Sequence, residues 1–114
     1  MGYNNQTNGI FDLEKESVIV GDVVVDALMY PHLISHEDSD KASEITIQKF
    51  LEFRRKQASA NSINTNDTKM ESDNLATIII AALINAGIIN AENRLQAIEI
   101  ACEEILVRRS MEQL

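Results

Sequence analysis

Apolar residues recur along this chain at intervals of three and four, which is the spacing of an amphipathic helix. The pattern is clearest in residues 73–114, where two apolar segments flank a short turn that contains Gly87. Glycine favours the left-handed backbone that follows many helices, and Asn90 is a good N-cap for the helix after the turn. Residues 73–114 are therefore predicted to form an antiparallel helical hairpin.

The last helix carries two apolar lines. The line predicted to face the neighbouring helix recurs at three and four and contains Leu95, Ile98, Cys102 and Ile105. The second line lies on another side of the helix and contains Ile100, Val107, Met111 and Leu114. A helix at the edge of a small bundle needs only one apolar face, so the second line predicts a homo-oligomer, most simply a two-fold dimer. The alternative is that the N-terminal segment of the same chain covers this line.

Residues 12–30 admit two interpretations. As a helix, the segment begins with Asp12 as a cap, and its apolar residues keep the helical period up to Pro31, which limits the helix. As a β-hairpin over residues 18–25, two runs of valine and isoleucine flank Gly21-Asp22 as a two-residue turn. A lone hairpin is only marginally stable in water, so the helix is favoured and the short β-hairpin is kept as the alternative.

Another helix is predicted after Ser35, because Ser35 followed by Asp38 fits a reciprocal capping pattern in which the usual partner is Glu or Gln. Acidic residues in its first turn and the basic Arg54-Arg55-Lys56 near its end suit the helix dipole. The basic triplet is therefore interpreted as stabilising the C-terminal end of the helix rather than as a nucleic-acid contact.

Composition divides the chain into four parts within one domain. The predicted parts are a flexible N-terminal tail (1–10), an N-terminal helical part (11–57), a polar linker rich in Asn, Ser and Thr (58–72) and the C-terminal hairpin (73–114). No internal repeat is predicted. The predicted fold class is all-α, a small bundle of about four helices.

The 114 residues carry 10 Lys and Arg against 18 Asp and Glu, a formal net charge of -8. This excess of acid disfavours broad phosphate binding and favours partners with a basic surface. The single cysteine excludes an intrachain disulfide and fits a reducing compartment. The first residues lack the pattern of a secretory signal, and the longest apolar stretch is too short and too broken for a membrane span. A cytoplasmic protein without a membrane contact is expected.

His32 and His36 are candidate metal ligands because they lie four positions apart and are followed by acidic residues. On one helix they would share a face and, with a carboxylate, bind zinc or iron. However, Pro31 precedes them and Ser35 resembles a helix cap, so the two histidines are expected to straddle a helix start. No metal site is therefore predicted, and a metal-binding protein remains an alternative.

The sequence lacks the common motifs of catalysis: a Gly-rich phosphate loop, a nucleophile elbow and a His-Glu-x-x-His pair. Cys102 lies in the predicted packing line, where burial disfavours the reactive thiolate. The adjacent Glu103-Glu104 are interpreted as a solvated helix surface rather than as an acid–base pair. A non-enzymatic protein without a cofactor is expected.

Two interaction classes remain. The favoured one is an acidic protein–protein interaction module, an adaptor or a regulatory or inhibitory subunit, that binds a protein with a basic surface and self-associates. The alternative is a helix-turn-helix DNA-binding regulator built on the last two helices. Its recognition helix would present Glu99, Glu103 and Glu104, which repel phosphate, so nucleic acid is not the expected partner.

Overall fold

The structure, a computed structural model, describes the backbone of residues 3–60 and 68–112 and the side chains of residues 14–56 and 69–108. Every regular element within these residues is helical, which confirms the all-α prediction. The elements in chain order are α1 (Tyr3–Met29), the 3-10 helix η1 (His36–Asp38), α2 (Ser39–Ala60), α3 (Thr68–Asn85), the 3-10 helix η2 (Ala91–Asn93) and α4 (Arg94–Glu112).

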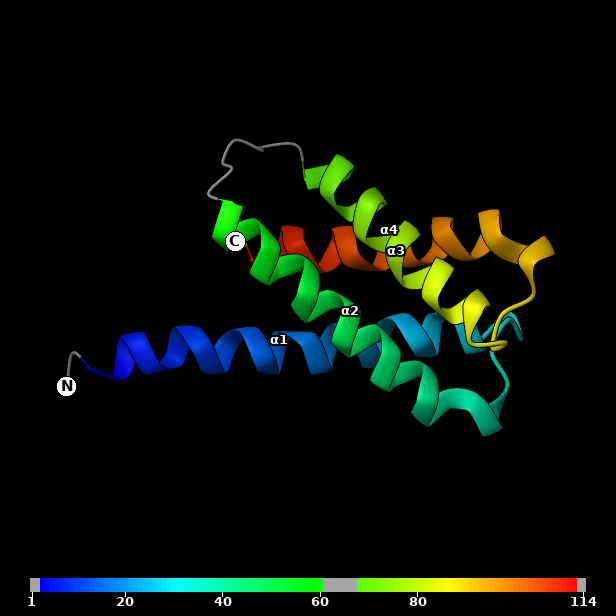
Figure 1. Ribbon diagram of the computed structural model, residues 1–114, viewed down its shortest axis with the longest axis horizontal. Helices are drawn as coiled ribbons and strands as arrows, with labels where there is room; N and C mark the ends of the chain where they lie inside the picture. Colours follow the sequence, from blue (N-terminus) through cyan, green and yellow to red (C-terminus); the bar gives the residue numbers. More distant parts are fainter. Residues whose placement is uncertain (1–2, 61–67, 113–114) are drawn as a thin grey trace.

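The helices of the described residues form two hairpins that pack against each other (Figure 1). α1 packs on α2 and α3 packs on α4, while α1 also contacts α4 and α2 contacts α3. α1 and α4 run in opposite directions along the long axis of the molecule, and α2 and α3 cross them obliquely (Figure 1). The predicted helical bundle with a C-terminal antiparallel hairpin is therefore confirmed.

Residues 18–25 lie in the middle of α1, so the β-hairpin alternative is wrong. Val20, Val24 and Leu28 are at most 3% exposed and follow one another at intervals of four, which buries one side of a helix. Burial of this stripe outweighs the modest preference of valine for strands. α1 ends at Met29, shortly before Pro31, as predicted.

The segments predicted as tail and linker overlap the helices. α1 begins at Tyr3, and its first turns extend beyond the other helices in Figure 1. α2 continues to Ala60 and α3 begins at Thr68, so residues 61–67 of the predicted linker lie outside the described residues. The helix boundaries therefore differ from the predicted ones.

The two hairpins are structural repeats of each other with an offset of 55 positions, so the prediction of no internal repeat is wrong. The offset carries His32 onto Gly87, and these are the residues with a left-handed backbone in the described part of the chain, at φ of 66° and 79°. It also carries η1 onto η2 and the first residue of α2, Ser39, onto the first residue of α4, Arg94. Each hairpin is a helix, a left-handed turn, a short 3-10 helix and a second helix.

Matching backbone hydrogen bonds close the two turns. The Leu33 N–H donates to the Leu28 carbonyl and the His32 N–H donates to the Met29 carbonyl, both at 2.9 Å. The equivalent bonds of the second hairpin, also at 2.9 Å, run from Ile88 to Leu83 and from Gly87 to Ile84. This pair of bonds is the Schellman arrangement, which satisfies carbonyls that would otherwise be left free at the end of a helix.

The repeat extends into the core. The matched buried pairs are Ser17/Ser72, Val20/Leu75, Val24/Ile79, Leu28/Leu83, Ile34/Ile89, Ala42/Ala97 and Phe50/Ile105. Several pairs differ in residue type while keeping their apolar character, so the repeat is one of packing more than of identity. Each hairpin presents the same inner face to the other, and the two faces close one shared core.

The buried side of α4 is rotated away from the predicted line, which is therefore wrong at its first position. Ala97, Ala101 and Ile105 are at most 1% exposed, whereas Leu95 is 74% exposed. Ile98 is half-buried and packs beside the core. Alanine allows α4 to approach its neighbours closely, and a pattern of large apolar residues does not reveal this.

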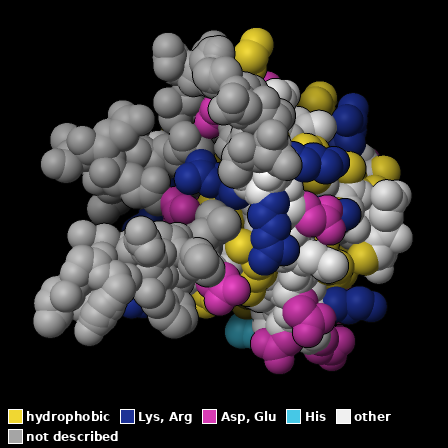
Figure 2. Space-filling model, turned by 60° about the vertical axis from the view of Figure 1, so that its left-hand side comes forward, with side chains coloured by type: hydrophobic (Ala, Val, Ile, Leu, Met, Phe, Trp, Pro, Cys, Tyr) yellow, Lys and Arg dark blue, Asp and Glu magenta, His cyan; other side chains and the backbone are white. Residues whose placement is uncertain are grey.

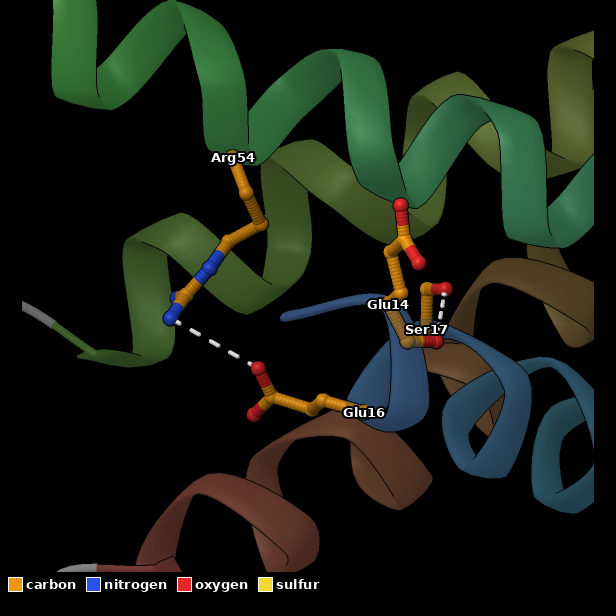
Figure 3. Close-up of polar contacts among 4 residues, drawn as sticks. All are labelled: Glu14, Glu16, Ser17 and Arg54. Atoms are coloured by element: carbon orange, nitrogen blue, oxygen red, sulfur yellow. Dashed lines mark hydrogen bonds and ion pairs between the residues drawn. The ribbon is translucent and has the colours of Figure 1, made fainter. Parts of the chain in front are cut away.

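Arg54 connects α2 to α1 rather than ending α2. One nitrogen of its guanidinium lies 3.8 Å from Oε1 of Glu16 on α1 (Figure 3). The guanidinium carbon also lies 5.8 Å from the ring centre of Phe50, within the range of a cation–π contact. Because α2 continues to Ala60 and has no basic residue in its last turn, the predicted role of Arg54-Arg55-Lys56 at the C-terminal end of the helix is wrong.

Candidate functional site

A groove of about 640 Å³ lies between α1 and α4. We call it the α1–α4 groove; its lining residues are Val23, Asp26, Ala27, Tyr30, Pro31, Ile100 and Glu104. Its volume falls in the range of sites that bind ligands. Because most of its lining is apolar and open to solvent, this groove is the candidate functional site.

The apolar part of the groove flanks the buried core. On α1, Val23 and Ala27 are half-buried and precede the buried Val24 and Leu28. On α4, Ile100 is half-buried and packs against the core. Two packed helices touch only along their facing sides, so the positions beside the core remain partly open and form the floor of the groove.

Tyr30 and Pro31 form the end of the groove where α1 stops. Tyr30 is 88% exposed, although its ring is large and partly apolar. Its backbone N–H donates to the Asp26 carbonyl at 3.1 Å, so the backbone completes the last turn of α1 while the side chain remains in solvent. Exposed tyrosine is typical of surfaces that bind other proteins.

Each wall of the groove carries one carboxylate. Asp26 on α1 is exposed and Glu104 on α4 is half-buried. Across the described residues, neither carboxylate forms an ion pair. None of the described lining residues is Lys or Arg. The groove is therefore apolar along its floor and negative on both walls.

Comparing the groove residues with the matched residues of the other hairpin shows which of them the helical packing requires. The apolar positions keep their character in the matched pairs Val23/Ile78, Ala27/Ala82 and Ile100/Ile45. The two acidic positions do not, because Asp26 matches Ala81 and Glu104 matches Lys49. The same packing position thus accepts a neutral or a basic residue, so the bundle itself does not require the two carboxylates.

The predicted self-association line begins in this groove. Ile100 forms part of the α4 wall, and Val107, about two turns further along the helix, is 52% exposed. Met111 belongs to α4, but its side chain lies outside the described residues, as does Leu114 entirely. The structure therefore brings Ile100 against α1 of the same chain and leaves Val107 at the surface.

The turn between α1 and α2 separates His32 from His36. His32 occupies the left-handed position, His36 begins η1, and both side chains are exposed. The Ser35 hydroxyl donates to Oδ2 of Asp38 at 3.2 Å and makes no capping hydrogen bond to the backbone, so the predicted reciprocal capping is wrong. In the described parts of the chain, no three His, Cys, Asp or Glu side chains come together in a way that could hold a metal ion.

Cys102 lines a smaller pocket of about 270 Å³ that also contains Lys69 and Asp73 of α3. Burial raises the pKa of the Cys102 thiol, and the carboxylate of Asp73 raises it further. A thiol whose pKa is raised stays protonated at neutral pH and is a weak nucleophile. Cys102 therefore has the chemical properties of a packing residue.

The surface carries charges of both signs. Figure 2 shows Lys and Arg side chains over the middle of one face, with some Asp and Glu side chains among them and a further group of Asp and Glu at its lower edge. On α4, Glu99 and Glu103 are exposed. The α1–α4 groove, lined by Asp26 and Glu104 and by no Lys or Arg among the described residues, is one of the acidic parts of this surface.

Comparisons with known proteins do not indicate a function, so the functional proposal rests on the groove. No protein-family model, curated protein or solved structure matches the chain. Within the described residues, none of the helices combines the length and the apolar character needed to span a bilayer.

Proposed function

We propose that the protein is a non-enzymatic, acidic protein–protein interaction module that acts in the cytoplasm as an adaptor or as a regulatory or inhibitory subunit. It binds a partner with a basic surface through the α1–α4 groove. The observation that carries this proposal is the apolar floor of the groove with one carboxylate on each wall, Asp26 and Glu104, neither of which forms an ion pair with another described residue.

The two parts of the groove would contribute differently to binding. Burial of the apolar floor supplies free energy, at about 25 cal/mol per Å² of apolar surface removed from water. The carboxylates select a cationic partner and accelerate its encounter, because the chain as a whole carries a net charge of -8. Tyr30, at the end of the groove, is one of the residue types that are enriched among the anchors of such contacts.

A photo-crosslinking amino acid at position 27 tests this proposal. Ala27 lies in the groove, and Ala82 is its match in the second hairpin with the same half-buried environment. We expect the probe at position 27, but not at position 82, to capture one dominant basic protein in cells. The adduct should be lost when Asp26→Asn and Glu104→Gln are combined. Equal adducts at both positions, or an adduct that survives the charge change, would contradict the proposal.

Self-association remains a separate prediction, supported by the exposed Val107. Light scattering of the wild type and of Val107→Asp tests it, since the variant should dissociate an oligomer without losing helix content. A mass of 12.7 kDa for the wild type at every concentration would contradict it. The DNA-binding and metal-binding alternatives also stay predictions, and no feature of the described residues favours them over the groove.

A further inference from the structure

The shape of the α1–α4 groove suits a helix. It follows α1 from Val23 to Tyr30, about two helical turns or roughly 10 Å at 1.5 Å per residue. Its walls are two helices that run in opposite directions (Figure 1), and a third helix can pack into the space between two such helices. The described residues contain no strand, so they offer no sheet edge to which an extended peptide could add.

The charges on the walls specify the flanks of such a helix. Asp26 lines the groove from α1 and Glu104 lines it from α4, beside an apolar floor. A helix whose apolar side chains enter the floor therefore needs Lys or Arg on both sides of its apolar stripe. The long stems of these residues can cover apolar surface while their cationic ends reach the carboxylates.

Charge also argues against a second copy of this chain as the occupant. The chain carries 18 acidic against 10 basic residues. A two-fold dimer through this groove would bring its own Asp26 and Glu104 close to those of the other copy. Like charges placed together at an interface oppose association, whereas a basic helix neutralises them.

We propose that the α1–α4 groove is a docking site for one amphipathic helix of a partner protein, with apolar residues at positions i and i+4 flanked on both sides by Lys or Arg. This inference rests on the proposed function and specifies its partner. Binding buries the apolar stripe of the helix on Val23, Ala27 and Ile100 and pairs its basic flanks with Asp26 and Glu104.

The probe is a fluorescent peptide of about 20 residues, long enough to form an isolated helix, with Leu and Lys at amphipathic helical spacing. A second peptide has the same composition in an order that destroys this spacing. The groove variant combines Asp26→Ala with Glu104→Lys, which introduces the residue types found at the matched positions of the second hairpin. The control variant combines Asp73→Ala with Glu99→Lys, which makes the same charge change at exposed positions outside the groove.

Fluorescence anisotropy should give the same Kd for the wild type and the control variant, and a Kd at least about tenfold higher for the groove variant. The peptide with disrupted spacing should bind the wild type at least about tenfold more weakly. Equal binding of the two peptides, or equal loss in both variants, would overturn the inference. Circular dichroism tests whether each variant folds. If the groove variant does not fold, the isosteric double variant Asp26→Asn and Glu104→Gln takes its place.

The two proposals fail in different ways. If the probe at position 27 captures a basic protein while the peptides show no preference for helical spacing, the helix inference is overturned and the proposed function stands. If neither experiment gives a groove-dependent signal, both are overturned. An adduct of position 27 with a second copy of this chain also overturns the inference.

Discussion

A Cβ atom on Gly21 of α1 would lie 2.7 Å from Cγ1 of Ile47 on α2, which is closer than two carbon atoms can approach. Glycine within a helix costs up to about 1 kcal/mol relative to alanine, so this position gives up helix propensity for close packing of α1 on α2. The matched positions of the second hairpin hold Ala76 and Cys102. In that hairpin, Ala76 on α3 is larger than the matching Gly21, and Cys102 on α4 is smaller than the matching Ile47.

Gly21→Ala should therefore lower the free energy of unfolding by about 1–2 kcal/mol, since overpacking outweighs the gain in helix propensity. In the background of Ile47→Ala, which removes Cγ1, the same substitution should instead stabilise the protein by up to about 1 kcal/mol. The nearest backbone atom, the Ser43 carbonyl oxygen at 3.5 Å, leaves room for the new methyl group. Urea denaturation of the wild type, the two single variants and the double variant measures the coupling free energy between the two positions. Additive effects would show that Ile47 does not constrain position 21.

The left-handed turns predict opposite effects in the two hairpins. His32 has a φ of 66°, which is unfavourable for a residue with a Cβ atom, whereas Gly87 adopts 79° without strain. His32→Gly should raise the free energy of unfolding by up to about 1 kcal/mol, and Gly87→Ala should lower it by about 1 kcal/mol. No heavy atom lies within 4 Å of a Cβ on Gly87, so the second effect comes from the backbone alone. Chemical denaturation that ranks the two variants the other way would contradict this assignment.

The orientation of α4 can be tested with two charged substitutions. Leu95 is 74% exposed, so Leu95→Asp should change the free energy of unfolding by no more than about 0.5 kcal/mol. Ile105 is 1% exposed, and Ile105→Asp should cost several kcal/mol, because it places a carboxylate in the core. Circular dichroism during denaturation compares them. Loss of the fold in the Leu95 variant would support the line predicted from the sequence instead.

The raised pKa of Cys102 predicts the pH dependence of its reaction with a disulfide reagent. Burial and the carboxylate of Asp73 keep the thiol protonated, so labelling of the native protein should be slow at pH 7 and rise through a midpoint above the usual value of about 8.5. Asp73→Asn should shift this midpoint downward. Because the pKa is raised in the folded state, its contribution to stability is present below about pH 8.5 and is lost as the pH rises through the folded pKa. Labelling as fast as in denatured protein at pH 7 would contradict the burial.

The sequence predicted the features that depend on local chemistry. The helical period of the apolar residues fixed the fold class, Pro31 limited α1, and Gly87 marked the left-handed turn before η2. It did not reveal the matching turn, because the left-handed residue there is His32 rather than glycine. The repeat was missed for a similar reason, since pairs such as Phe50/Ile105 conserve burial and not identity.

Features that depend on the relation between distant helices were not predicted. The inner side of α4 is built on Ala97 and Ala101, whose small side chains carry little hydrophobic signal. The groove joins residues of α1 to residues of α4, which are far apart in sequence. The one local sign was Asp26, a charge inside an otherwise apolar run, and that sign alone did not distinguish a solvated face from a binding site.

The repeated hairpins have a consequence for the two outer surfaces of the chain. A single hairpin leaves its inner face uncovered, so each half depends on the other to keep its core residues out of water. Because both halves belong to one polypeptide, their outward sides need not be alike. Asp26 in the first half corresponds to Ala81 in the second, so one shared core supports two chemically different exteriors.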